Sequence, residues 1–341
     1  MINKDFGTDY TLNASFVVDV VSGASQNYYD SSYNSDGASG ASATDTTSGA
    51  SALARGIGID SSNVAYGNVD YDDTRVAGSL LLTKRFENRD ELTVGASYST
   101  EASGEYLHWL DSSKNRSVSF GISYQMNEIL KHCSSIDGCS GASESMDAIA
   151  INTQLGFSQN IDSTSSAKVA LFFSNDDGYL DNPYLNVVRN YVEGGSADIV
   201  GEKRPDTKTA YGISTKYAKA LSDNFTLHLD YRYYSDDWGI DSRTLSGDTF
   251  YEFGDDLIFE LGLRGYTQTK ADFYNGSKDY FTDEIYASSD SRLSDFNAFT
   301  YKGGVNYKIN KELEFNFTAE YYTQTTGLDA TYFMTGFRYN F

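Results

Sequence analysis

The chain contains almost no proline and no long hydrophobic run. Only 2 prolines occur in 341 residues. Because proline cannot donate a hydrogen bond to a neighbouring strand, this scarcity favours long, paired β-strands. The absence of any run of about 18 apolar residues excludes transmembrane helices. The mean hydropathy of −0.46 is still compatible with a membrane β-barrel, whose strands are apolar only at every second residue.

Histidine and cysteine are also scarce, with 3 and 2 residues respectively. An outer-membrane protease or phospholipase needs a histidine coupled to Asp, Asn or Ser. With His108, His132 and His228 as the only candidates, we expect no enzymatic activity. No Cys-x-x-Cys-His motif is present, and we expect no haem or other cofactor. Cys133 and Cys139 are close in sequence and predict an extracellular disulfide, whereas a metal site would need more ligands than His132.

The charge balance limits the partners. The chain carries 26 basic and 48 acidic residues, a net charge of −22. Such a surface repels nucleic acid and does not offer a basic patch to anionic lipid. Acidic surface loops that bind divalent cations or the ions that bridge lipopolysaccharide are one explanation, and a salt-rich habitat is another. We therefore expect contact with outer-membrane lipid and lipopolysaccharide, but not with nucleic acid.

Aromatic residues are abundant, and they alternate along the C-terminal segment. Side chains of a strand point to opposite faces in turn, which places four aromatics on one face: Phe333, Phe337, Tyr339 and Phe341. This segment resembles the terminal strand of bacterial outer-membrane β-barrels, including the pattern read by the barrel-assembly machinery. Gly336, Tyr339 and Phe341 match that pattern, while Met334 replaces its usual polar first residue. The alternative is an edge strand of a soluble β-sandwich.

The second half of the chain separates the two alternatives. Its apolar residues alternate with charged ones, which would face the interior: Asp230, Arg232, Glu260, Arg264, Lys302 and Glu320. A sandwich core would bury these charges at a cost of several kcal/mol each unless they were paired. A barrel turns them toward a water-filled lumen. The pattern predicts an all-β, closed, antiparallel transmembrane β-barrel in the bacterial outer membrane, with residues 1–341 as one domain.

The connections predict the orientation of this barrel. Short turns at 87–91, 160–165, 221–224, 254–256 and 310–312 should be periplasmic, and the longer loops extracellular, at about 21–72, 103–115, 134–147, 175–207 and 275–292. Weak strands over 128–133 and 240–253 bring the expected count to about 14, or about 12 if both are loops. Closure requires the last strand to pair with the strand around 8–20.

Two loops differ in composition. The segment 21–72 is rich in Gly, Ala, Ser, Asp and Tyr and shows no separate domain, whereas 175–207 carries many apolar side chains. Because such side chains avoid water, the second loop should fold inward as a constriction or plug. Its candidate contact residues are Tyr179, Leu180, Tyr184 and Tyr191.

An acidic cluster begins this second loop. Asp176, Asp177 and Asp181 surround Gly178, an arrangement that could bind Ca²⁺. The segment lacks the regular ligand alternation and closing Glu of an EF-hand, so an Asp-rich turn is the alternative. Either way, these residues predict an acidic mouth that favours cations.

Five segments resemble a family of bacterial outer-membrane barrels described as a domain of unknown function: Asp19–Ser25, Asp177–Tyr184, Tyr231–Ile240, Ala271–Tyr274 and Ser288–Phe296. The resemblance extends over nearly the whole chain, but the loop with Cys133 and Cys139 departs from the family pattern. It implies an outer-membrane location and association with a small lipoprotein and with flavin- or thiol-redox partners. It implies no catalytic residues.

Two functional hypotheses follow. In the first, the barrel houses or anchors a partner polypeptide, such as a small lipoprotein, a redox carrier or an extracellular filament. In the second, it is a porin-like channel with a cation-favouring mouth. Barrels of this size lie between filled eight-stranded barrels and open 16–18-stranded porins. Strand number therefore does not decide between them.

Overall fold

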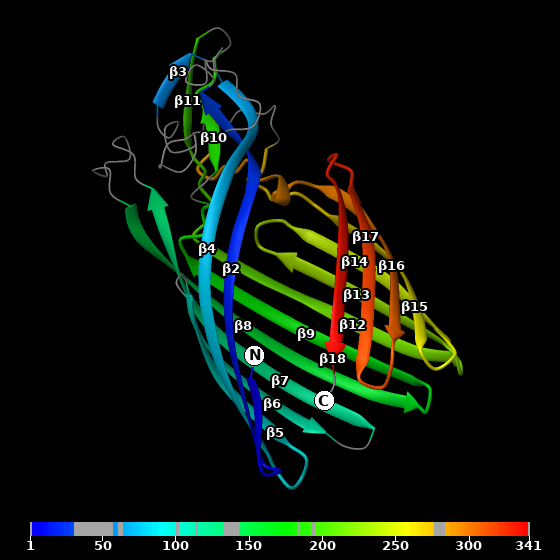
Figure 1. Ribbon diagram of the computed structural model, residues 1–341. Helices are drawn as coiled ribbons and strands as arrows, with labels where there is room; N and C mark the ends of the chain where they lie inside the picture. Colours follow the sequence, from blue (N-terminus) through cyan, green and yellow to red (C-terminus); the bar gives the residue numbers. More distant parts are fainter. Residues whose placement is uncertain are drawn as a thin grey trace.

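The computed structural model describes residues 2–30, 57–60, 64–99, 102–112, 115–132, 143–182, 185–192, 195–275 and 284–339. They form two antiparallel sheets, of fifteen and three strands. The large sheet curls around a lumen, and the small sheet lies beyond one end of it (Figure 1). No helix within these ranges has the length and apolar character needed to cross a membrane.

The large sheet follows chain order. Its strands are β1 (Ile2–Phe6), β2 (Tyr10–Asp30), β4 (Val64–Arg85), β5 (Glu91–Ser99), β6 (Ala102–Ser112), β7 (Arg116–His132), β8 (Ser143–Asp162), β9 (Ser165–Gly178), β12 (Thr207–Ser222), β13 (Phe225–Asp236), β14 (Asp241–Phe253), β15 (Leu257–Gln268), β16 (Phe296–Lys308), β17 (Leu313–Gln324) and β18 (Asp329–Tyr339). The small sheet contains β10 (Asn186–Arg189), β11 (Ser196–Gly201) and β3 (Ile57–Asp60), and η3 (Ser291–Leu293) is a short 3-10 helix.

The predicted strand number is confirmed, although one expected strand is not separate and one observed strand was not expected. Fifteen strands less the five-residue β1 leave fourteen. The weak strand over 240–253 is β14, but 128–133 belongs to the continuous β7. The missing crossing is β6, where we expected the loop 103–115. Its outward face is hard to recognise because Leu107 and Trp109 are flanked by Glu105 and Asp111.

Two neighbouring pairs of strands, β2 with β4 and β7 with β8, are much longer than the last six strands of the barrel. β2 and β4 contain 21 and 22 residues, and β7 and β8 contain 17 and 20. β13 to β18 contain only 11 to 13 residues, close to the 9–11 or so that cross a bilayer. The expected loop 21–72 is thus strand as far as Asp30 and again from Val64, and this ribbon rises above the barrel (Figure 1). Its largely polar sequence, with more Tyr and Asp than Gly and Ser, pairs through the backbone without an apolar alternation.

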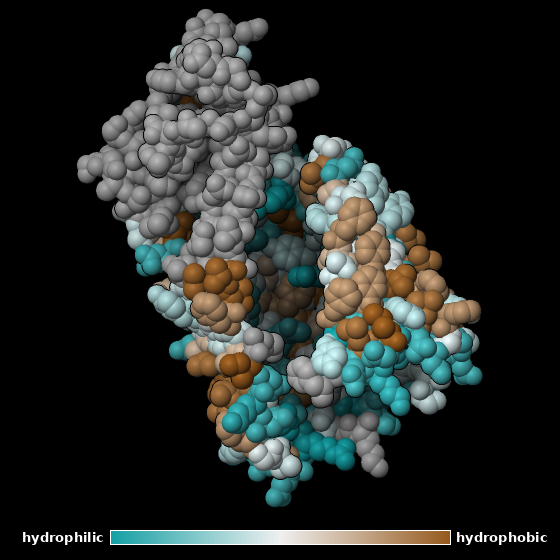
Figure 2. Space-filling view, in the orientation of Figure 1, coloured by the Kyte–Doolittle hydropathy of each residue, from teal (hydrophilic) through white to brown (hydrophobic). Residues whose placement is uncertain are grey.

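The outward face is apolar, as predicted. Directly opposite partners include Tyr301 with Tyr321, Val305 with Phe317, and Phe315 with Phe337. The rings of Phe315 and Phe337 lie 5.2 Å apart. Brown side chains cover the visible outer wall, and hydrophilic ones gather at its lower end (Figure 2). Phe315, Phe317 and Tyr321 therefore face the lipid.

The predicted closing ladder is the main difference from expectation. Within the described residues β18 pairs with β17, and no ladder joins it to β1 or β2. The edge of β2 is occupied by β1, which pairs Ile2 with Ala14 and Phe6 with Tyr10. The first strand therefore takes up part of the edge, residues 8–20, that we assigned to the last strand. Phe341 itself lies outside the described residues.

The connections confirm the orientation. The turns between β4 and β5, β8 and β9, β12 and β13, β14 and β15, and β16 and β17 are short and share one end. The long connections 179–206 and 269–295 lie at the other end, which is extracellular. We define the extracellular cap as the small sheet (β3, β10 and β11), η3 and the described residues of these two connections. β10 and β11 contact β2.

Candidate functional site

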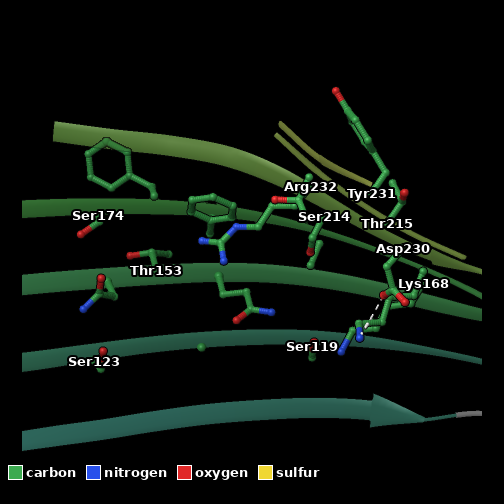
Figure 3. Close-up of a pocket in the computed structure, with 18 of the residues that line it drawn as sticks. Ser119, Ser123, Thr153, Lys168, Ser174, Ser214, Thr215, Asp230, Tyr231 and Arg232 are labelled. Atoms are coloured by element: carbon green, nitrogen blue, oxygen red, sulfur yellow. Dashed lines mark ion pairs between the residues drawn. The ribbon is translucent and has the colours of Figure 1, made fainter. Parts of the chain in front are cut away.

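A polar cavity of about 850 Å³ occupies the lumen, lined by side chains of β6 to β9 and β12 to β15. Alternation along β13 decides which side chains enter it. Asp230 and Arg232 point to the cavity side of the strand, and Tyr231 points away (Figure 3). The lumen wall is thus built by the same period of two that builds the lipid face.

Charged side chains form a row across the wall of this cavity. Lys168 on β9 is directly opposite Lys216 on β12, and Lys216 is directly opposite Asp230 on β13. Lys216 Nζ lies 3.0 Å from Asp230 Oδ1. The row continues through Ser246 to Arg264 on β15. One carboxylate therefore lies among three cations.

Arg232 lies next to this row and stacks on an aromatic ring. Its guanidinium carbon is 4.8 Å from the ring centroid of Phe172. Such cation–π contacts fix the orientation of a guanidinium without neutralising its charge. The planar donors of Arg232 thus remain available to the lumen.

The remaining predicted lumen charges lie further around the sheet. Lys302 Nζ is 2.6 Å from Glu260 Oε1, and Lys302 is directly opposite Glu320. All six predicted charges, with Asp230, Arg232 and Arg264, lie on the inward face. Sequence reasoning missed Lys168, Lys216 and Asp248, although their even spacing from recognised inward residues could have identified them.

The extracellular cap contains a buried polar centre at Glu202. Its side chain is 0% exposed, and Arg204 Nε lies 2.6 Å from its Oε1, without the alignment of a hydrogen bond. The backbone amide of Asn182 donates to Oε1 at 2.6 Å, and Ser288 Oγ donates to Oε2 at 2.5 Å. Burial raises the pKa of the Glu202 carboxyl, and Arg204 and these donors oppose that rise. One carboxylate thus joins both long connections.

Asp290 forms the second half of this centre. Its Oδ2 accepts hydrogen bonds from Arg204 Nη2 at 2.9 Å and from Arg292 Nη2 at 2.7 Å. Burial opposes ionisation of the carboxyl, yet the bonds from Arg292 and the charge of Arg204 hold its pKa below the usual range. Nearby, Val187 and Ala287 are both 0% exposed and pack together. The centre is therefore enclosed by an apolar contact between the two connections.

A further contact set anchors the cap to the barrel at the β13–β14 turn. Asp236 Oδ1 accepts the backbone amides of Trp238 and Ile240 at 3.1 and 3.0 Å. The indole of Trp238 contacts the ring of Phe273 edge-on at 5.1 Å. Lys208 Nζ lies 3.5 Å from Asp236 Oδ2 and 4.9 Å from the Trp238 ring centroid. These contacts fix the connection 269–295 to the rim.

The predicted contact residues of the second loop lie in or beside the cap. Tyr179, Leu180 and Tyr191 are partly buried, and the backbone amide of Tyr179 donates to Asp147. Tyr184 lies outside the described residues, as do Cys133 and Cys139. No described residue of 179–206 lines the lumen cavity. The loop is folded, but at the extracellular end rather than along the cavity wall.

The predicted acidic cluster is divided. Asp176 and Asp177 alternate on β9 and point to opposite faces, while Asp181 Oδ1 accepts the backbone amide of Arg204 at 2.5 Å. Burial raises the pKa of Asp181, and this hydrogen bond counteracts it. Across the described ranges no group of three or more His, Cys, Asp or Glu side chains is placed to hold a metal ion. Ca²⁺ binding stays a prediction.

The two histidines with described side chains lie against aromatic rings. His108 stacks on Tyr106 at 6.0 Å, and His228 lies 4.9 Å from Phe250. In the part of the chain that the structure describes, neither imidazole is hydrogen-bonded to a carboxylate or hydroxyl. The arrangement does not resemble a nucleophile–histidine pair.

Four of the five sequence segments that carry the family resemblance contribute residues to the cap or contact it. Glu202 and Arg204 connect Asp181 to Ser288 and Asp290, and Trp238 contacts Phe273. A family model described as "Protein of unknown function (DUF3570)" matches residues 1–336. The chain belongs to this family. No curated protein matches it.

Two solved structures with TM-scores above 0.5 show the same fold at low identity, and a third is similar at a lower score. The FrpB iron transporter from Neisseria meningitidis is 10% identical with a TM-score of 0.52, over 99% of this chain and 56% of that one. The ferric enterobactin receptor PfeA from Pseudomonas aeruginosa is 9% identical with a TM-score of 0.51, over 94% and 49%. CdiB from Acinetobacter baumannii is 11% identical with a TM-score of 0.48, over 97% and 60%.

The chain thus spans about half to three-fifths of the length of these relatives. The likeness shows the fold. The DUF3570 chain is a β-barrel of the bacterial outer membrane.

Proposed function

We propose that the barrel houses a partner polypeptide at the outer membrane, such as a small lipoprotein, a redox carrier or an extracellular filament. The supporting observation is the one-sided extracellular extension. β2 has 21 residues and β13 has 12, a difference of nine. At about 3.3 Å per residue, β2 reaches about 30 Å further along its length. A barrel that only admits solutes needs no such ribbon.

The cap supports the same proposal. Its polar centre buries Glu202 and Asp290 between two connections that are far apart in sequence, and Trp238 fixes it to the rim. Such a centre is rigid because each charge needs its partners in place. A rigid extracellular surface beside a projecting ribbon suits protein contact. The polar lumen below provides space for a segment of the partner.

Shortening the ribbon tests the proposal. Gly23 pairs with Tyr71, so residues 24–70 can be replaced by Asn-Gly, a turn suited to a two-residue hairpin. We expect native mass spectrometry of wild-type barrel from native membranes to show a stoichiometric companion, which the shortened variant loses. A variant with Asn-Gly in place of the β17–β18 turn residues 326–327 should retain it. Absence of a companion from the wild type would refute the proposal.

A porin-like channel is the second candidate, favoured by the polar lumen cavity of about 850 Å³. In that case the purified barrel conducts steadily. Changing Asp176, Asp177 and Asp181 to Asn should then lower cation selectivity, most clearly at low ionic strength, where screening is weak. If a partner fills the lumen, these changes should barely alter conductance. Neither proposal assigns a catalytic step to the chain.

A further inference from the structure

The lining of the lumen cavity has the opposite charge to the protein as a whole. The chain carries a net charge of −22. Around the cavity, four basic side chains (Lys168, Lys216, Arg232 and Arg264) face two acidic ones (Asp230 and Asp248), a local balance of +2. Basic side chains therefore outnumber acidic ones at this one place on the inward face.

The basic residues are also arranged unfavourably for an empty lumen. Lys168 and Lys216 are directly opposite each other on neighbouring strands, and like charges in such a pair repel. Asp230 neutralises only Lys216, at 3.0 Å. Among the described residues, Lys168, Arg232 and Arg264 have no carboxylate within ion-pair distance. A bound anion would relieve this repulsion.

The donor types indicate what kind of anion fits. The planar guanidinium groups of Arg232 and Arg264 match the paired oxygens of carboxylates and phosphates. Arg232 is already oriented by the Phe172 ring at 4.8 Å. Between the charges lie the hydroxyl groups of Ser214 and Ser246, opposite Arg232 and Arg264 respectively. Several charged oxygens could be bound at once.

We propose that the middle of the lumen is a binding site for small multivalent oxyanions, held by Lys168, Arg232 and Arg264. Carboxylate and phosphate groups share the recognised chemistry. The site lies on the periplasmic side of Asp176, near the end of β9, and of Asp181, which follows that strand. This proposal does not rest on the identity of a partner polypeptide.

Isothermal titration of the full-length, detergent-purified barrel with citrate and with pyrophosphate tests the site. The test variant combines Lys168→Gln, Arg232→Gln and Arg264→Gln. The matched control combines Lys4→Gln, Lys84→Gln and Lys311→Gln. It removes the same charge, but Lys4 and Lys84 are opposite the outward residues Leu12 and Tyr10, and Lys311 lies in a periplasmic turn.

We expect wild type and control to bind equally, more weakly as salt is raised, and the test variant to bind at least tenfold more weakly. Binding of both anions, of citrate alone or of pyrophosphate alone supports the site and assigns the group it prefers. Heat-modifiable migration on gels verifies that each variant is folded. Lack of binding by the wild type, or equal binding by the test variant, would overturn the proposal.

Discussion

The barrel wall and the extracellular cap are held together in different ways. In the wall, every strand repeats the same backbone ladder, and side chains face lipid or the lumen. In the cap, a few unlike groups meet once, with Glu202 in contact with Arg204, Ser288 and the Asn182 amide. The wall therefore distributes its stability over many equivalent contacts, whereas the cap concentrates it in a polar centre.

This difference predicts where substitutions act. The effect of a substitution in the wall on stability depends mainly on whether the side chain faces lipid or water, because the backbone hydrogen bonds do not depend on the side chain. A cap position matters through the particular partners it would leave unsatisfied. Changes in the cap should remain local to the cap, and changes on the lipid face should affect the whole barrel.

The largest effect is expected for Glu202→Ala. The change leaves Arg204 without one of its two carboxylates and removes the acceptor for Ser288, which should cost about 3–5 kcal/mol. Hydrogen exchange should show faster exchange of the described parts of 179–206 and 284–293. The exposed turn variant Glu87→Ala serves as control. Unchanged exchange in the cap would contradict the assigned role of Glu202.

On the lipid face, Phe317→Arg should destabilise the barrel by about 2–4 kcal/mol, because an arginine near the bilayer midplane loses its hydration. Urea unfolding in lipid vesicles measures the loss. The neighbouring Thr318→Arg directs the same side chain to the lumen and should cost much less. Equal losses for the two variants would mean that the faces are wrongly assigned.

At the base of the cap, Gly178→Ala should cost about 1–3 kcal/mol. Gly178 has φ +118°, and a Cβ there would lie 2.4 Å from the carbonyl oxygen of Asp147. Gly254→Ala is the matched control, since its φ of +67° is also left-handed but a Cβ meets nothing within 4 Å. Thermal unfolding of both variants should show the larger decrease for Gly178→Ala.

The smallest effect concerns pH. Because burial raises the pKa of Glu202 in the folded cap, its contribution to stability is fully present below the ordinary Glu pKa of about 4.3 and is lost as pH rises through the folded pKa. Asp290, with a lowered pKa, acts oppositely, but only as pH falls below the ordinary Asp range.

Above the ordinary Glu pKa of about 4.3, the free energy of cap opening, measured by hydrogen exchange, should therefore fall as pH rises, until Glu202 is ionised in the folded cap. The slope from this one group cannot exceed about 1.4 kcal/mol per pH unit. Glu202→Gln should reduce it and leave the part that comes from Asp181, whose pKa burial also raises. An unchanged slope in this variant would assign the pH dependence to other groups.

The barrel wall was predictable from the amino-acid sequence. Alternation is a local signal, and it correctly placed the aromatics of β16 to β18 on the lipid face and Asp230, Arg232 and Glu260 on the inward face. It failed where the alternation is weak. β6 has only Leu107 and Trp109 as apolar outward residues, and the largely polar upper ends of β2 and β4 lie above the membrane, where no apolar face is required.

The polar centre of the cap and the row of charges in the cavity could not be predicted from the sequence, because both depend on contacts between distant segments. Asp181, Glu202 and Ser288 are up to about a hundred positions apart, and their union depends on two connections meeting in space. The opposition of Lys168 and Lys216 depends likewise on the register between β9 and β12. A strand's own sequence fixes which face a side chain takes, but its neighbour across the sheet is set by how the chain folds back on itself.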